Sequence, residues 1–248
     1  MDFEEARKAI VAQFAAVPVA EQPFPHFYTR EAFPPAFFQE IRANLPPEEL
    51  LTPTDARRSS NPYGSHRRKF GINAQNVEML DPARRRFWSR LQSLLCGREF
   101  LELVLSRFGA GIARRYGGRP LDPVGRLEIN VDGENYAIAP HTDSEAKIAT
   151  MLFYLPEDES RADLGTAIFA PKQAGFVSER PNQYPFELFD KVKAFPYVPN
   201  SCFTFLKTDN SFHGRETVTG ENLRRPMMFV SIQHSRQSLE GRAAAAAM

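Results

Sequence analysis

The stretch YAIAPHTDSEAKIATMLFYL, residues 136–155, places His141 and Asp143 two positions apart, between two short apolar segments. YAIAPH and KIATMLFYL both have the length and composition of β-strands. Because residues i and i+2 of an extended chain point to the same face, the pair offers an imidazole and a carboxylate to a single point. The pair alone is a weak motif, and a loop histidine that makes local hydrogen bonds is the alternative interpretation.

More segments of strand type surround this stretch. From about residue 124 to the C-terminal region, short apolar runs alternate with turn residues, and this spacing predicts a barrel or jelly roll. The expected strands are VGRLEINV, YAIAPH, KIATMLFYL, GTAIFAP, KVKAFPYV, CFTFLK and RRPMMFVSIQ.

The part of the chain before residue 121 has a different, mostly helical pattern. Apolar positions recur at helical spacing in residues 3–16, and a second helix is expected to begin near Pro35. Asp81 followed by Pro82 is a typical helix start, and REFLELVLSRF predicts a further helix. The fold class is therefore α+β, mainly β, with an N-terminal helical layer packed on the barrel.

The chain is expected to form a single catalytic domain with a short tail. The expected boundaries are 1–240 for the domain, 1–120 for its mostly helical part, 121–235 for the jelly-roll core, 171–190 for an insertion and 241–248 for a low-complexity tail.

The composition excludes several classes of protein. The 248 residues include 31 Lys and Arg against 30 Asp and Glu, a formal charge of +1, so no nucleic-acid or membrane surface is indicated. No apolar run reaches the roughly 20 residues of a membrane span. Cys96 and Cys202 form neither a disulfide framework nor a cysteine-based zinc site. A soluble cytoplasmic protein is expected, and nothing in the sequence indicates its oligomeric state.

A later segment, CFTFLKTDNSFHGRETV, ends a predicted strand near a further histidine, His213. Two neutral imidazoles and one carboxylate on one side of an ion form the 2-His-1-carboxylate facial triad. That triad leaves coordination positions of a ferrous ion open for a co-substrate and oxygen. The other histidines suit this role less well; they are His26, His66 and His234.

A pair of arginines begins the last predicted strand. Arg224 follows His213 after ten residues, and an arginine aimed into a barrel from a strand start is a good bidentate clamp for a carboxylate. A solvated strand edge is the alternative interpretation of this pair. Since adjacent strand residues point to opposite faces, Arg225 is a rival for the same role.

Taken together, His-Thr-Asp, a strand ending FYL, GT-x-I-F, His213 and Arg224 resemble the Fe(II)/2-oxoglutarate-dependent dioxygenases, in particular the subgroup similar to prolyl hydroxylases. The resemblance covers residues 124–233, and it implies a double-stranded β-helix (jelly-roll) barrel. It also implies Fe(II), 2-oxoglutarate and O2 as cofactor and co-substrates. The implied iron ligands are His141, Asp143 and His213.

The same resemblance assigns the contacts of 2-oxoglutarate. Arg224 matches the basic residue that pairs with the distal carboxylate, and Tyr154 matches a tyrosine that hydrogen-bonds it. Thr150 shares the strand parity of Tyr154 and is either a pocket residue or an ordinary core residue. Pro226 departs from the pattern, because many relatives carry a small hydroxyl residue two positions after the arginine.

The implied reaction couples oxidative decarboxylation of 2-oxoglutarate, which gives succinate and CO2, to hydroxylation of an unactivated C–H bond. Asp143 stands where the related halogenases have a small residue, so the chain resembles a hydroxylase or another oxidase and not a halogenase. A non-catalytic jelly-roll module that binds a ligand is the main alternative. A cupin-like metal enzyme that does not use 2-oxoglutarate is the third hypothesis.

Clues to the substrate, a small molecule or a peptidyl side chain, are few. Arg126, Glu128 and Asn130 alternate along one strand and face either the barrel mouth or solvent. SHRRKFG, residues 65–71, is a basic loop that either recognises an anion or is solvated. The aromatics of the 171–190 insertion form a lid or pack the insertion onto the barrel; they include Tyr184, Phe186 and Phe189.

Overall fold

The computed structural model describes residues 2–54, 66–178, 182–217, 220 and 223–235. The predicted tail at 241–248 lies outside these residues, as does part of the 171–190 insertion. In the part of the chain that is described, no helix is both long and apolar enough to cross a membrane.

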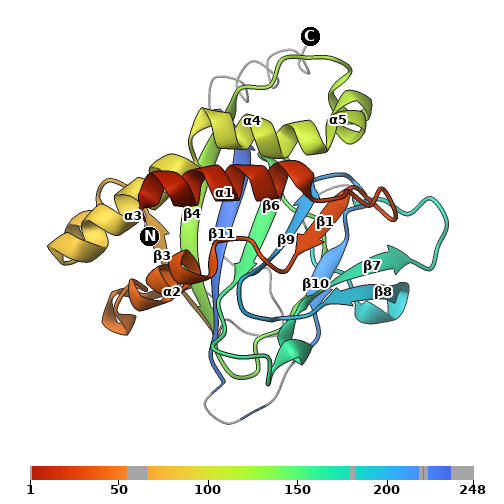
Figure 1. Ribbon diagram of the computed structural model, residues 1–248. Coiled ribbons are helices and arrows are strands. Elements are labelled where there is room, and N and C mark those ends of the chain that lie inside the picture. Colours follow the sequence, from red (N-terminus) through yellow and green to blue (C-terminus); the bar gives the residue numbers. More distant parts are fainter. Residues whose placement is uncertain (1, 55–65, 179–181, 218–219, 221–222, 236–248) are drawn as a thin grey trace.

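Two antiparallel sheets form the body of the protein (Figure 1). The seven-stranded major sheet has the order β1-β9-β6-β11-β4-β3-β2, and the four-stranded minor sheet has the order β5-β10-β7-β8. The major strands are β1 (His26–Thr29), β2 (Thr52–Pro53), β3 (Arg67–Ile72), β4 (Pro123–Asp132), β6 (Lys147–Tyr154), β9 (Ser201–Leu206) and β11 (Arg225–His234). The minor strands are β5 (Ile138–His141), β7 (Thr166–Pro171), β8 (Phe189–Phe195) and β10 (His213–Arg215). This arrangement confirms the predicted jelly roll.

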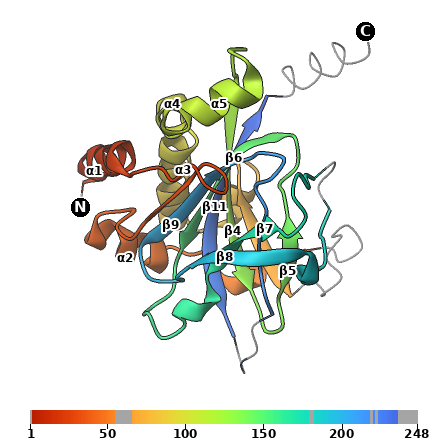
Figure 2. The same cartoon turned by 90° about the vertical axis from the view of Figure 1, so that its right-hand side faces the viewer.

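Helices cover the face of the major sheet that points away from the minor sheet (Figure 2). They are α1 (Phe3–Ala16), α2 (Pro35–Ala43), α3 (Pro82–Leu95), α4 (Arg98–Arg107) and α5 (Gly109–Tyr116). Short 3-10 helices lie at Glu48–Leu50, Asn76–Met79, Ala162–Leu164 and Phe186–Leu188. The predicted start of α3 is confirmed, because the Asp81 carboxylate accepts hydrogen bonds from the backbone N–H groups of Ala83 and Arg84.

Alternation along β11 shows how the major sheet separates two cores. Met228 and Val230 are buried in the core shared with the helices. Met227 is buried in the second core, which lies between the two sheets, and Phe229 packs against that core. Because side chains alternate across a strand, Arg225 falls on the inner face with the second pair.

One expectation for the N-terminal part was wrong. Residues 67–71 of the predicted basic loop belong to strand β3, which pairs along the edge of β4. Its register sets Arg67 opposite Asp132 and Lys69 opposite Asn130. The N-terminal part therefore extends the major sheet in addition to supplying the helices.

Candidate metal centre

The three residues predicted as metal ligands come together at one end of the barrel. His141 ends β5 and His213 begins β10, and these two residues are directly paired in the minor sheet. Their imidazole rings lie 4.3 Å apart, centroid to centroid. Asp143 follows two residues after His141, and one potential ligand atom from each side chain lies within 4.8 Å of the other two. This spacing suits a single bound ion.

Hydrogen bonds fix the orientation of both imidazoles. Nδ1 of His141 lies 3.0 Å from the carbonyl oxygen of Ala139, and Nδ1 of His213 lies 3.0 Å from that of Ser211. Because a carbonyl only accepts, each Nδ1 carries the proton and donates it, which leaves the lone pair of each Nε2 free for a metal.

Burial keeps both rings neutral. It lowers the pKa of His141 to about 3, with a further contribution from neighbouring His213, and it also lowers the pKa of His213. Neutral imidazoles are the protonation state that metal coordination requires.

Asp143 supplies the carboxylate in its ionised form. Burial alone raises the pKa of a carboxyl group, but the charge and the hydrogen bond of the Lys147 ammonium outweigh that effect and hold the pKa of Asp143 well below its ordinary value. Lys147 Nζ lies 2.7 Å from one carboxylate oxygen, and Thr150 Oγ1 lies 2.6 Å from the other. Two imidazoles and one carboxylate form the donor set typical of a non-haem ferrous site.

A cavity of about 250 Å³ opens beside the three ligands. The other residues that line it are Arg67, Tyr136, Ile138, Lys147, Thr150, Leu152, Thr166, Gly214, Arg215, Arg225 and Phe229. Thr150 is thus a pocket residue, as one of the two interpretations of the sequence proposed. The cavity is small and carries positive charge, which suits a compact anion.

The preference for Arg224 as the residue that points into the barrel was wrong. Its side chain is 60% exposed and contacts Glu48 at 3.2 Å, whereas the Arg225 side chain is 3% exposed and lines the cavity. Strand parity explains the difference, because Arg225 shares the inner face of β11 with Met227.

Arg225 is held firmly in place. Its Nη1 donates to Asp132 at 2.8 Å and its Nε donates to the carbonyl oxygen of Leu164 at 2.5 Å. Tyr154 lies beneath it, with the guanidinium carbon 5.4 Å from the ring centroid. The Tyr154 hydroxyl accepts a hydrogen bond from the backbone N–H of Thr166 at 3.0 Å. The contact of Tyr154 with 2-oxoglutarate stays a prediction.

The predicted substrate residues share one face of β4 but do not line the cavity. Arg126 is exposed, and Glu128 is half-buried with Lys69 at 3.6 Å. Asn130 is buried, and its side-chain oxygen has no hydrogen-bond partner among the described residues. Their role in substrate recognition stays a prediction.

Among the charged and tyrosine residues of the cavity, Tyr136, Lys147 and Arg215 were not identified from the sequence, and Arg67 was considered only as part of the basic segment 65–71. Two of these residues could have been found from their spacing to the proposed metal ligands. Arg215 lies two positions after His213, and Lys147 follows Asp143 by four. Arg67 and Tyr136 reach the cavity only through the pairing of β3 with β4 and the turn that follows β4, which no local pattern indicates.

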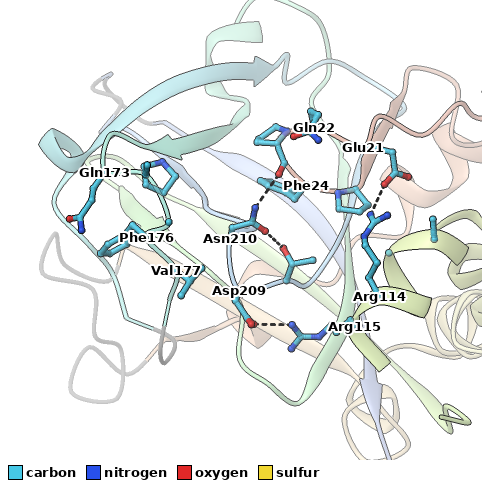
Figure 3. A pocket seen from close by; sticks show the side chains of 18 of the residues that line it. Glu21, Gln22, Phe24, Arg114, Arg115, Gln173, Phe176, Val177, Asp209 and Asn210 are labelled. Atoms are coloured by element: carbon cyan, nitrogen blue, oxygen red, sulfur yellow. Dashed lines mark hydrogen bonds and ion pairs between the residues drawn. The ribbon is translucent and has the colours of Figure 1, made fainter. Parts of the chain in front are cut away.

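The aromatics of the 171–190 insertion pack it onto the barrel, as one of the two interpretations proposed. Phe176, Tyr184 and Phe186 pack against a cluster with Phe189 and Phe212 at its centre. Beside this insertion lies a wider groove of about 1160 Å³ that none of the three metal ligands lines. Figure 3 shows its charged side chains in pairs, including Arg114 with Glu21 and Arg115 with Asp209.

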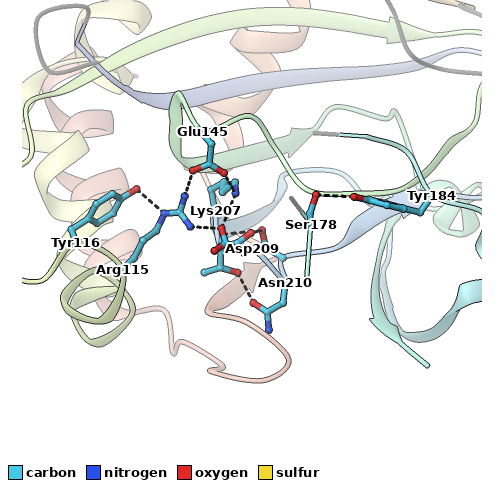
Figure 4. A network of polar contacts seen from close by, with 10 residues as sticks. Arg115, Tyr116, Glu145, Ser178, Tyr184, Lys207, Asp209 and Asn210 are labelled. Carbon is cyan, nitrogen blue, oxygen red and sulfur yellow. Dashed lines mark hydrogen bonds and ion pairs between the residues drawn. The ribbon is translucent and has the colours of Figure 1, made fainter. Parts of the chain in front are cut away.

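A charged network connects the loop that carries Asp143 with the loop that leads to His213 (Figure 4). Lys207, which is 1% exposed, contacts Glu145 and Asp209, and Arg115 contacts the same two carboxylates. Glu145 lies two residues after Asp143, and Asp209 lies four residues before His213. The network therefore holds the loop that contains Asp143 against the loop that precedes His213.

Fold and site together define a double-stranded β-helix protein with a two-histidine, one-carboxylate constellation. No family model matches this sequence, and no curated protein does either. Its structure is similar to that of a Pseudomonas putida prolyl-4-hydroxylase, with TM-score 0.50, 11% identity, and coverage of 92% of this chain and 99% of that one.

A second similar structure is a Trichoplax adhaerens prolyl hydroxylase in complex with a peptide fragment of the hypoxia-inducible factor oxygen degradation domain. Its TM-score is 0.54 at 12% identity, with 94% and 91% of the two chains covered. An oxidoreductase of the 2OG-Fe(II) oxygenase family from Burkholderia pseudomallei has TM-score 0.49 at 15% identity, with 92% and 90% covered. The likeness to the two prolyl hydroxylases shows that the chain shares their fold.

Proposed function

We propose that this protein is an Fe(II)- and 2-oxoglutarate-dependent oxygenase that hydroxylates an unactivated C–H bond of a small-molecule or peptidyl substrate. One observation carries the proposal: two neutral imidazoles and an ionised carboxylate converge at a cavity that also contains several arginines. The oxygenase fold supports the same function.

The residues fit an iron ion and its co-substrate in charge and shape. His141, Asp143 and His213 would hold the metal through Nε2, a carboxylate oxygen and Nε2. When bound, iron with 2-oxoglutarate and O2 supplies the oxidising chemistry, in which formation of succinate and CO2 is coupled to hydroxylation of the substrate. Asp143 fills the carboxylate position of the ligand set, which favours hydroxylation over halogenation.

The protein contributes positioning and charge. Thr150 holds one oxygen of Asp143 and so orients the carboxylate toward the metal. The arginines of the cavity attract the distal carboxylate of 2-oxoglutarate, while Leu152 and Phe229 supply apolar wall that limits the entry of water. Lys147, at 23% side-chain exposure, is free to move toward solvent when a cation takes its place beside Asp143.

The test is anaerobic addition of Fe(II) and then 2-oxoglutarate to the metal-free protein. We expect the weak visible charge-transfer band of the chelate, followed by succinate when O2 is admitted. His213→Ala should give neither, whereas His66→Ala, which changes an exposed histidine, should behave as the unmodified protein. Absence of the band from the unmodified protein would refute the proposal. A band without succinate would favour the non-catalytic binding module.

A further inference from the structure

Two of the three arginines in the cavity are already engaged with one carboxylate. Arg67 makes two hydrogen bonds to Asp132, at 2.6 and 3.2 Å. Arg225 reaches the same carboxylate at 2.8 Å, and its other nitrogens donate to Leu164 at 2.5 Å and to Thr166 at 3.4 Å. Asp132 is fully buried, so it offsets one of these two positive charges and occupies part of their hydrogen-bond donors.

The third arginine, Arg215, has most of its donors unused. Its side chain is buried and lines the cavity, and Nη2 donates to the carbonyl oxygen of Tyr136 at 3.2 Å. Nε and Nη1 have no hydrogen-bond partner among the described residues. A buried cation with unpaired donors lowers the stability of the folded protein. An anion that enters the cavity removes this penalty, so such a group is expected to bind an anion strongly.

The charges around Arg215 are unbalanced. Arg67, Arg215 and Arg225 together carry three positive charges, and Asp132 is the buried carboxylate within their reach. A guanidinium group is charged at neutral pH, so Arg215 adds a positive charge that Asp132 does not balance. A carboxylate placed on Arg215 relieves both the unpaired donors and part of the excess charge.

Strand β10 brings Arg215 close to the metal ligands. It lies two residues after His213, and both side chains line the same cavity. The residue between them, Gly214, packs directly on β5, where an added Cβ would come within 2.5 Å of the carbonyl oxygen of Ile138. A molecule that binds the metal at one end can therefore extend along the cavity to the Arg215 guanidinium.

From these observations we propose that Arg215 is the principal residue that binds the distal carboxylate of 2-oxoglutarate. This inference rests on the proposed function. Arg225, the rival clamp that strand parity left open, is a positioning residue. It holds Asp132 and the backbone of Leu164 in place, while Arg215 makes the charge-assisted hydrogen bonds to the ligand.

Arg215→Met and Arg215→Lys, with Arg224→Met as the exposed control, test the assignment. Anaerobic Fe(II)-loaded protein is titrated with 2-oxoglutarate and, separately, with 2-oxobutyrate, which lacks the distal carboxylate. We expect Arg215→Met to raise the Kd for 2-oxoglutarate about 100-fold and Arg215→Lys about 10-fold, because a lysine keeps the charge without the planar fork. The Kd for 2-oxobutyrate, the affinity for Fe(II) alone and all values for Arg224→Met should not change.

Each other outcome has a definite meaning. If Arg215→Met weakens both oxoacids equally, Arg215 only shapes the cavity and the assignment is wrong. If it leaves 2-oxoglutarate binding intact and lowers only turnover of a substrate, Arg215 binds the substrate instead. If the unmodified protein gives no band with 2-oxoglutarate, the proposed function fails, which is a different result from failure of Arg215.

Discussion

The hydroxyl of Thr150 donates a hydrogen bond to the second carboxylate oxygen of Asp143, across 2.6 Å between two buried side chains. Thr150 lies on the inner face of β6, so it holds the only carboxylate of the proposed ligand set in a fixed orientation. Thr150→Val keeps the shape and removes the donor. We expect the affinity for Fe(II) to fall about 10- to 100-fold, as is typical when a metal ligand loses its hydrogen-bonding support.

Thr204→Val is the matched control for this experiment. Thr204 is equally buried and lies on β9, next to β6, but its parity is that of Cys202 and Leu206, which face the helices. Titration of Fe(II) into both variants, with thermal unfolding alongside, separates ligation from stability. Equal losses of Fe(II) affinity in the two variants would contradict the role of Thr150.

The two neighbouring arginines at the start of β11 should differ sharply in their effect on stability. Arg225→Met leaves buried Asp132 with Arg67 alone, and breaking a buried ion pair in this way is expected to cost about 2–4 kcal/mol. Arg224→Met removes an exposed contact with Glu48 and should cost less than about 0.5 kcal/mol. Urea denaturation of the metal-free variants measures both values, and similar losses would show that the assigned orientations are wrong.

The strand register at this point could not be read from the sequence. Either of two adjacent arginines could point to the inner face of the strand. The residues that share a face with Arg225, Met227 and Phe229, have apolar neighbours on both sides, so the sequence does not show which face is inner. Most of the fold could be predicted from the sequence, because turn residues mark the ends of the strands and Asp81 caps the start of its helix. The pair His141 and Asp143 was readable for the same reason, since it lies at the end of a clearly bounded strand.

Residues 67–72 show the opposite case. Their charged sequence resembles a solvated loop, and they become a strand only because the open edge of β4 pairs with them. That pairing brings Arg67 to Asp132, two residues that are far apart in the chain. Long-range pairing of this kind leaves no local periodicity, so the placement of Arg67 beside the cavity emerged only from the structure.

Gly214 is expected to be essential for the spacing of the two histidines. A Cβ at this position would come within 2.5 Å of the carbonyl oxygen of Ile138, so Gly214→Ala must push β5 away from β10. His141 and His213 lie on these two strands, and we expect their shared affinity for Fe(II) to fall at least tenfold.

Gly109→Ala provides the control, because nothing lies within 4 Å of the added methyl group at that helical position. It should leave Fe(II) affinity unchanged and stability equal or slightly higher. Isothermal titration with Fe(II) under anaerobic conditions compares the two variants. An unchanged affinity in Gly214→Ala would show that the strands tolerate separation at the site.

Stability of the metal-free protein should fall as the pH is lowered from 7 to 5. Burial lowers the pKa of three histidines, His26, His141 and His213, below their ordinary value of 6.5. The unfolded chain therefore binds protons near pH 6.5 that the folded chain does not, so this stability is present above that pH and is lost below it. Each histidine contributes a slope of up to about 1.4 kcal/mol per pH unit.

Urea denaturation in the presence of a chelator, repeated at several pH values, measures this slope. His141→Asn should reduce the slope of the free energy of unfolding against pH by about the contribution of one histidine. His66→Ala, at an exposed position, should leave this slope unchanged. Added Fe(II) binds only the folded state with neutral imidazoles, so it should raise stability most at pH 7 and progressively less toward pH 5. A flat profile between pH 7 and 5, or stability that rises as the pH falls, would mean that these imidazoles do not stay neutral on folding.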